Sequence, residues 1–233
     1  MKVVILAGGF GTRLSEYTDT IPKPMVPIGG KPIIEHIMDI YSKFGHKEFY
    51  IALGYKGEVI KNYFKNFKHK SWEINLIETG SDTLTGGRLK RMEKYLCGET
   101  FLLTYGDGIS DIDINALIKF HKAHKKMVSI SAVRPPARFG SLSLDGSTVI
   151  KFKEKKQLGE SWINGGFFVI NQNFFNFLTG DKTVLEKEPL EKVTELKELK
   201  AFKHEGFWQC MDHKLDKDYL DQLIIEKKAT WIE

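Results

Sequence analysis

Hydrophobic and polar residues alternate along the first half of the chain in a pattern typical of strands and helices that follow one another. Residues 3–7 form a short apolar run, rich in β-branched side chains and closed by glycines, which predicts a strand buried on both faces. Apolar residues at helical spacing predict a helix over residues 33–44, with Pro32 in its first turn and Gly45 after its last. The pattern continues through predicted strands at 49–53, 74–77 and 101–104 and predicted helices at 59–67, 89–96 and 112–124.

From about residue 127 the pattern changes, because strand-like runs follow one another with few helical residues between them. These runs lie at 128–133, 141–144, 149–152 and 167–170, and Asp145-Gly146 between two of them is a typical hairpin turn. Two helices at 190–199 and 215–225 and a strand at 200–203 are predicted near the C-terminus. We therefore expect an α/β fold with a doubly wound, mostly parallel sheet and a smaller α+β lobe. One domain of residues 1–233 would contain a first lobe of 1–126 and a second of 127–233.

The composition is that of an ordinary globular protein, with 42% hydrophobic and 28% charged residues in 233. The net charge of +5 suits an anionic small molecule as well as a polyanion. Scattered basic runs such as Lys68-His69-Lys70 match no nucleic-acid-binding motif, so no nucleic-acid partner is expected. Two cysteines, Cys97 and Cys210, are too few for a zinc ligand set or a disulfide framework. No apolar run is long enough for a signal peptide or a membrane span, so a cytoplasmic location without membrane attachment is expected.

A glycine-rich turn directly follows the first predicted strand. Gly8, Gly9 and Gly11 would lie at the carboxyl end of a central strand, where open α/β sheets bind ligands, and their N–H groups can converge on an anion. Leu14 occupies the position of the third glycine of a dinucleotide fingerprint, and no Gly-Lys-Ser/Thr follows as in a P-loop. The turn therefore predicts a phosphate site of another kind, with a plain structural turn as the alternative.

Two cations follow this turn at positions suited to a triphosphate. Arg13 ends the glycine loop, and its planar guanidinium matches nonbridging phosphate oxygens. Lys23 stands between Pro22 and Pro24, which restrict the backbone on either side of it and so help to aim its ammonium. A solvated loop lysine is the alternative interpretation of Lys23. Its position shortly after a glycine loop favours a functional role.

Several motifs resemble those of a known family. GGFGTRL (8–14) with PKPMVPIGGKP (22–32) resembles the signature of the nucleotidyltransferases that activate sugar 1-phosphates. Further segments resemble the glucose-1-phosphate cytidylyltransferase branch: TGSDTLTGGRLKR (79–91), TYGDGISDIDI (104–114), RFGSL (138–142), INGGFFVIN (163–171) and GFWQCMD (206–212). The resemblance spans nearly the whole chain. It implies a Rossmann-like nucleotidyltransferase fold, Mg2+ as cofactor, and transfer of a cytidylyl group from CTP to a phosphorylated small molecule, foremost α-D-glucose 1-phosphate, for polysaccharide or capsule biosynthesis.

The resemblance also implies roles for individual residues. Arg13 and Lys23 would be catalytic, at the β and γ phosphates and at the α phosphate, and Asp107 and Asp212 would bind Mg2+. The nucleotide-binding residues it implies are Leu6, Ala7, Gly8, Gly9, Gly11, Thr12, Arg13, Lys23, Thr79, Gly86, Gly87, Arg88 and Asp107. The acceptor-binding residues it implies are Gly106, Arg138, Glu154, Lys155, Asn164 and Gly165. Independently of the family, Asp107 follows the predicted strand 101–104, at the ligand-binding end of the sheet. No general base is required, because a phosphate monoester is already largely ionised at neutral pH.

Two departures from the family pattern concern the acceptor. Glu154-Lys155-Lys156 stands where the family usually has Glu-Lys-Pro, and the chain is shorter between Phe64 and Thr79 than is typical of the branch. Transfer of the same cytidylyl group to phosphoglutamine in capsule modification therefore stays open, as does a noncatalytic nucleotide-sensing module. The sequence leaves the oligomeric state open between a monomer and a homo-oligomer. Asp111 and Asp113 are expected as helix caps and Phe207-Trp208 as core.

Overall fold

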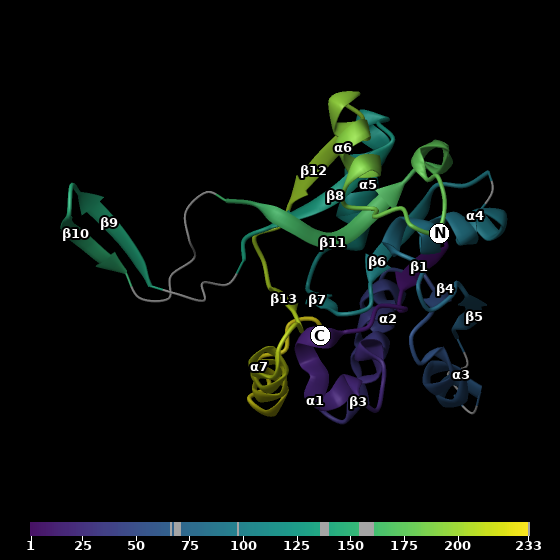
Figure 1. Cartoon of the computed structure of the whole chain (residues 1–233), viewed down its shortest axis with the longest axis horizontal. Helices are drawn as coiled ribbons and strands as arrows, with labels where there is room; N and C mark the ends of the chain where they lie inside the picture. The colour runs from purple at the N-terminus through teal and green to yellow at the C-terminus, as the bar shows by residue number, and fades with distance from the viewer. Residues whose placement is uncertain (66, 68–70, 97, 136–139, 154–160, 233) are drawn as a thin grey trace.

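The computed structural model describes residues 1–65, 67, 71–96, 98–135, 140–153 and 161–232. Its centre is a seven-stranded sheet in the order β12-β8-β11-β6-β1-β4-β5 (Figure 1). These strands are β12 (Leu199–Lys203), β8 (Val128–Val133), β11 (Ile163–Ile170), β6 (Phe101–Tyr105), β1 (Val3–Leu6), β4 (Glu48–Leu53) and β5 (Glu73–Glu78). All neighbours are parallel except β11, which is antiparallel to both β6 and β8. The predicted α/β class with a mostly parallel sheet is confirmed.

Helices cover both faces of this sheet, because side chains of a strand point alternately to opposite faces. In β1, Val3 and Ile5 join one core, whereas Val4 and Leu6 join the other. The first core is covered by α2 (Ile33–Lys43), α3 (Gly57–Lys65), α5 (Ile114–His124) and α7 (Lys214–Ile225). The second is covered by α4 (Thr85–Leu96), α6 (Glu188–Glu195) and the 3₁₀ segment η3 (Gln172–Phe177). This is the doubly wound arrangement that a strand apolar at every position predicts.

Strands from the second half of the chain extend the same sheet, since β8, β11 and β12 all belong to it. Outside it, β9 (Ser141–Asp145) and β10 (Thr148–Lys153) form the predicted hairpin, which stands apart from the sheet in Figure 1. A two-strand pair of β7 (Gly108–Ser110) and β13 (Trp208–Cys210) was not predicted. Another short pair, β2 (Pro27–Ile28) with β3 (Lys31–Pro32), precedes α2. The β7–β13 pair matters most, because it joins two segments that are about a hundred residues apart.

Three smaller expectations are tested by the structure. Asp113 caps α5, since its Oδ1 accepts a hydrogen bond of 2.9 Å from Ala116 N. Asp111 caps nothing; its Oδ1 instead lies 3.0 Å from His204 Nε2, so that expectation is wrong. The helix predicted over 190–199 ends at Glu195, and Leu199 already belongs to β12. No helix in the described ranges is both long and apolar enough to cross a membrane.

Candidate active site

A cavity of about 580 Å³ opens at the carboxyl ends of β1 and β6. This is the position at which open α/β sheets bind ligands. The glycine loop after β1 forms one wall, and the loop after β6 forms another. The cavity lining includes most of the predicted site residues, namely Leu6, Ala7, Gly8, Gly9, Gly11, Thr12, Arg13, Lys23, Arg88, Gly106, Asp107, Asn164, Gly165 and Asp212. The fold therefore gathers segments that lie up to two hundred residues apart in the sequence.

The glycine loop has a conformation that requires glycine at one position in particular. Gly11 has a φ of 66°, in the left-handed region, and a Cβ placed there would lie 2.8 Å from Thr18 Cγ2. Directly after it, η1 (Thr12–Leu14) and α1 (Ser15–Thr18) begin, and Leu14 is fully buried. The Thr18 hydroxyl donates a hydrogen bond of 3.0 Å back to Gly11 O. These contacts fix the direction in which the loop leaves the sheet, and with it the position of Arg13.

Lys23 is a buried lysine held between two carboxylates. It begins η2 (Lys23–Met25) after Pro22, which is extended, and its side chain is only 10% exposed. Its Nζ donates to Asp107 Oδ2 at 2.6 Å and to Asp212 Oδ1 at 2.7 Å. Burial alone would lower the pKa of Lys23, but the charge of Asp107 and hydrogen bonds to both aspartates raise it above its ordinary value. The ammonium therefore stays charged throughout the neutral range.

Asp107 and Asp212 approach each other because β13 pairs with β7. Met211 N donates a 2.9 Å hydrogen bond to Asp107 O, and the backbone N–H of Asp212 donates to Asp216 Oδ2 at the start of α7. Arg13 Nη1 lies 2.6 Å from Asp212 Oδ2, although the Arg13 side chain is 64% exposed. Burial alone would raise the pKa of Asp212, but the hydrogen bond and charge of Lys23 hold it below its ordinary value. Both cations predicted for the phosphates thus contact a predicted metal ligand.

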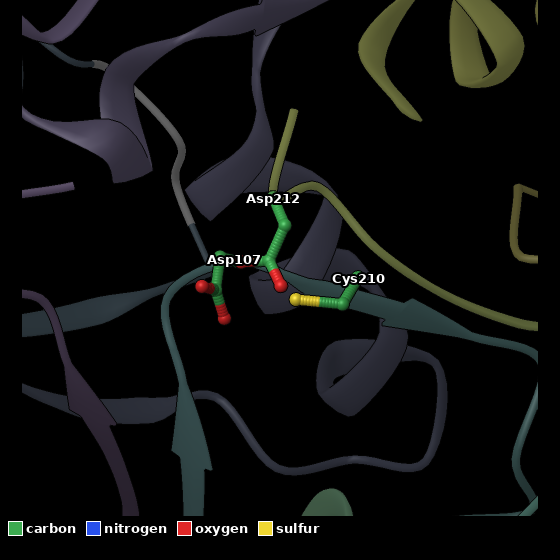
Figure 2. Close-up of side chains that lie close together, drawn as sticks. All are labelled: Asp107, Cys210 and Asp212. Atoms are coloured by element: carbon green, nitrogen blue, oxygen red, sulfur yellow. The ribbon is translucent and has the colours of Figure 1, made fainter. Parts of the chain in front are cut away.

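The carboxylate pair has the chemistry that Mg2+ requires. Mg2+ is typically held by one or two carboxylates, with phosphate oxygens and water completing an octahedron. The oxygens of Asp107 and Asp212 already converge on one positive centre, the Lys23 ammonium. Figure 2 shows both carboxylates together with the sulfur of Cys210, which ends β13. The residues present therefore fit a divalent cation bound beside a triphosphate.

Arg88 was predicted as a nucleotide-binding residue. In the structure its guanidinium donates hydrogen bonds to backbone carbonyls of the protein itself. Nη1 donates to Leu53 O at 3.1 Å and to Gly80 O at 2.6 Å, and Nη2 donates to Gly8 O at 2.8 Å and to Ser81 O at 3.1 Å. Burial lowers the pKa of Arg88 below its ordinary value. The side chain lines the cavity, yet its hydrogen bonds connect the glycine loop to the loops after β4 and β5. In the described geometry these hydrogen bonds hold the glycine loop in position, and the predicted contact of Arg88 with the nucleotide stays a prediction.

This interpretation predicts that Gly54→Ala destabilises the protein. A Cβ at Gly54 would lie 2.2 Å from Arg88 Nη1, so the guanidinium would have to leave its carbonyl partners. We expect a loss of about 1–3 kcal/mol in the free energy of unfolding, measured with urea. Gly180→Ala is the matched control, because its added methyl would meet no atom within 4 Å. Equal stability of the two variants would contradict the positioning role.

Three predicted nucleotide-binding residues, Thr79, Gly86 and Gly87, are not among the residues that line the cavity. Thr79 is fully buried, and its hydroxyl hydrogen-bonds to a backbone carbonyl and to Arg88. A Cβ at Gly86 would lie 2.9 Å from Thr183 O, and one at Gly87 would lie 2.5 Å from Asp181 O. These glycines let α4 begin in close contact with residues 181–183. The predicted acceptor residues Arg138, Glu154 and Lys155 lie outside the described residues.

Other residues line the cavity without having been predicted. Tyr105 OH donates to Glu186 Oε1 at 2.6 Å and accepts from Asn164 Nδ2 at 3.2 Å. Trp208, expected as core, lines the cavity, and its Nε1 donates to Gly165 O at 2.7 Å. Glu186 stands in no local pattern typical of a site, so only the fold shows it, whereas Tyr105 lies in the motif of residues 104–114 that also contains Asp107. The motif that contains Trp208 was a signal that could have placed it near the site.

A doubly wound sheet with a glycine loop, two cations and a carboxylate pair at one end is typical of α/β enzymes that act on phosphorylated ligands. Comparison with known proteins gives the family. The chain belongs to the nucleotidyl transferase family, whose model matches residues 2–212.

Relatives are similar over nearly the whole chain. A protein named glucose-1-phosphate cytidylyltransferase from Salmonella typhi is 49% identical over 253 aligned positions, which cover 99% of this chain and 98% of the relative. The alignment is longer than the chain, so this relative carries residues that the chain lacks. A mannose-1-phosphate guanylyltransferase 1 from Arabidopsis thaliana is 33% identical and covers 96% of this chain and 64% of the relative. The crystal structure of HddC from Yersinia pseudotuberculosis superposes with a TM-score of 0.77 at 28% identity, over 96% and 99% of the two chains.

Proposed function

We propose that this protein is a Mg2+-dependent cytidylyltransferase that converts CTP and a sugar 1-phosphate, foremost α-D-glucose 1-phosphate, into a CDP-sugar and pyrophosphate. The observation that carries the proposal is the convergence of Lys23, Arg13, Asp107 and Asp212 in one cavity. The 49% identity to a glucose-1-phosphate cytidylyltransferase over nearly the full length of both chains supports the choice of nucleotide and acceptor.

The reaction requires positioning and neutralisation of charge. An oxygen of the acceptor phosphate attacks the α-phosphorus of CTP, the bond from that phosphorus to the β-phosphate oxygen breaks, and pyrophosphate leaves. Lys23, fixed between two prolines, places a positive charge at the α-phosphate, and Arg13 holds the β and γ oxygens with its planar fork. When bound to Asp107 and Asp212, Mg2+ would neutralise phosphate oxygens and fix their geometry. The acceptor phosphate and the α-phosphate of CTP, both anionic, can then approach each other.

The ion pairs of Lys23 and Arg13 explain how these cations become available. Lys23 and Arg13 now neutralise Asp107 and Asp212. With CTP bound, the triphosphate oxygens would become the partners of Lys23 and Arg13, and a divalent cation held by Asp107 and Asp212 would supply the positive charge that these carboxylates need. Binding therefore exchanges one set of charge pairs for another, and neither the lysine nor the carboxylates are left buried without a partner.

The acceptor end of the cavity carries a carboxylate suited to sugar hydroxyls. Glu186 accepts hydrogen bonds from Tyr105 OH and, at 2.7 Å, from Thr85 Oγ1, and it lines the same cavity as Asn164 and Gly165. We expect Glu186→Gln to raise the acceptor KM about tenfold, because a charged acceptor of hydroxyl hydrogen bonds is lost. The KM for CTP should change little. Glu188→Gln, on a glutamate outside the cavity lining, is the control, and equal acceptor KM values for both variants would contradict this placement.

The function is tested by measuring pyrophosphate release. The protein is incubated with Mg2+ and one of CTP, UTP, dTTP or GTP, each with α-D-glucose 1-phosphate, other sugar 1-phosphates or phosphoglutamine. We expect the highest kcat/KM with CTP and α-D-glucose 1-phosphate. If turnover is highest with phosphoglutamine, the enzyme is still a cytidylyltransferase, but its acceptor is phosphoglutamine and not a sugar 1-phosphate. Nucleotide binding without turnover on any acceptor would instead identify a nucleotide-sensing module.

A further inference from the structure

We propose that Cys210 converts the carboxylate pair into a three-donor site for a thiophilic divalent cation of the zinc class, with Asp107, Cys210 and Asp212 as ligands. The site binds such an ion in the absence of nucleotide. The binding is a property of these three side chains and does not depend on which reaction the cavity supports.

The three donors meet because of the β7–β13 pair. Cys210 is the last residue of β13 and lies opposite Gly108 of β7, directly after Asp107. One ligand atom from each of Asp107, Cys210 and Asp212 lies within 4.8 Å of the other two. Figure 2 shows the Cys210 sulfur beside the Asp212 carboxylate. Cys210 is one of the residues that line the cavity.

The donor set selects the class of ion. Mg2+ prefers oxygen ligands and rarely takes sulfur, whereas Zn2+, Co2+ and Cd2+ bind thiolate and carboxylate together. In a tetrahedral zinc site the ligand atoms stand about 3.3–3.7 Å apart, given metal–ligand lengths of about 2.0–2.3 Å. The three donor atoms, which lie within 4.8 Å of one another, therefore have to approach by at most about 1.5 Å. The thiol proton leaves to solvent as the metal–sulfur bond forms.

The Lys23 ammonium lies between the two carboxylates, at the position toward which the donor atoms would move. Its ammonium bridges Asp107 and Asp212, at 2.6 and 2.7 Å, and a divalent cation would replace it there. A Zn2+-class ion on three protein ligands uses the same two carboxylates as Mg2+. It therefore competes with Mg2+ for the site, and more Mg2+ or a chelator relieves the competition.

The test is a titration of the metal-free protein with Co2+, because a thiolate bound to Co2+ gives a near-ultraviolet charge-transfer band that oxygen ligands do not give. We expect the band to saturate at one Co2+ per chain and to disappear when Zn2+ is added. Cys210→Ser and Cys210→Ala should abolish the band, and Asp212→Asn should weaken Co2+ binding at least about tenfold. Cys97→Ser, at the other cysteine of the chain, is the matched control and should keep the band.

Thermal unfolding of each variant establishes that it is folded before the spectra are compared. A band that persists in both Cys210 variants, or that is lost in Cys97→Ser alone, would overturn the assignment. The absence of any band in the wild-type protein would overturn it as well. If Mg2+-dependent turnover is intact in that case, only the thiolate site is rejected, and the proposed function stands.

Discussion

Lys23→Met is expected to lower kcat at least about a hundredfold while it raises the affinity of the ligand-free protein for Mg2+. Loss of the ammonium removes a fixed positive charge at the α-phosphate, and the removal of one preorganised electrostatic contact typically costs this much. The same loss leaves Asp107 and Asp212 without the cation that now bridges them. The two carboxylates then attract Mg2+ without competition from lysine.

Two measurements separate this result from simple misfolding. Kinetics with CTP and the acceptor give kcat, and the rise in melting temperature with Mg2+ reports binding to the folded state. We expect Mg2+ to raise the melting temperature of the variant more than that of the wild type. Lys31→Met is the matched control, because Lys31 also stands next to a proline and pairs with an aspartate, Asp39, outside the cavity lining. Unchanged turnover in a folded Lys23→Met variant would reject the role of this lysine.

Asp212→Asn and Asp107→Asn are each expected to lower kcat/KM about a hundredfold at limiting Mg2+. Each substitution removes one of two negative ligands, and a metal that stabilises phosphate charge contributes several kcal/mol to the transition state. The apparent Mg2+ requirement should rise accordingly in a metal titration of turnover.

Of the two aspartate variants, only Asp212→Asn should remove the carboxylate charge that now pairs with Arg13. Among the residues that the structure describes, Asp212 pairs with both Arg13 and Lys23, whereas Asp107 pairs with Lys23. Asp39→Asn is the control for the loss of a carboxylate outside the cavity lining. A metal titration of either variant identical to that of the wild type would remove that residue from the metal site.

Much of the fold followed from local pattern, and the exceptions have physical reasons. β1 is apolar at every position because both of its faces are buried, so it was found and its place in a parallel sheet was inferred. α6 ends four residues before the predicted end because Lys197 adopts a left-handed φ of 59°. Left-handed backbone is usually signalled by glycine, and a lysine gives no such signal.

The candidate site was predictable where its residues stand in a local motif. Arg13 and Lys23 follow the glycine loop, Lys23 is flanked by two prolines that restrict the backbone, and Asp107 follows a clear strand. Asp212 reaches Asp107 only through the β7–β13 pair, and strands of three residues are too short to show a pattern. The family resemblance supplied Asp212, whereas sequence reasoning from residue types alone did not.

Interactions between distant side chains were beyond prediction. Arg88 stands in a motif that the resemblance assigned to the nucleotide, and its use as a connector of four backbone carbonyls depends on the three loops that the fold brings around it. Glu186 lies in an unremarkable charged segment and meets Tyr105 only in the folded chain. In the sequence Cys210 was only one of two cysteines. The fold places its sulfur beside two carboxylates, which local sequence could not indicate.

The most direct test of the central claim is a crystal structure of the protein with CTP and Mg2+. We predict that the triphosphate lies in the cavity with Lys23 and Arg13 at its phosphate oxygens, and that Asp107 and Asp212 have exchanged these cations for Mg2+. A triphosphate bound elsewhere, or one bound while both ion pairs of Lys23 remain intact, would contradict the account.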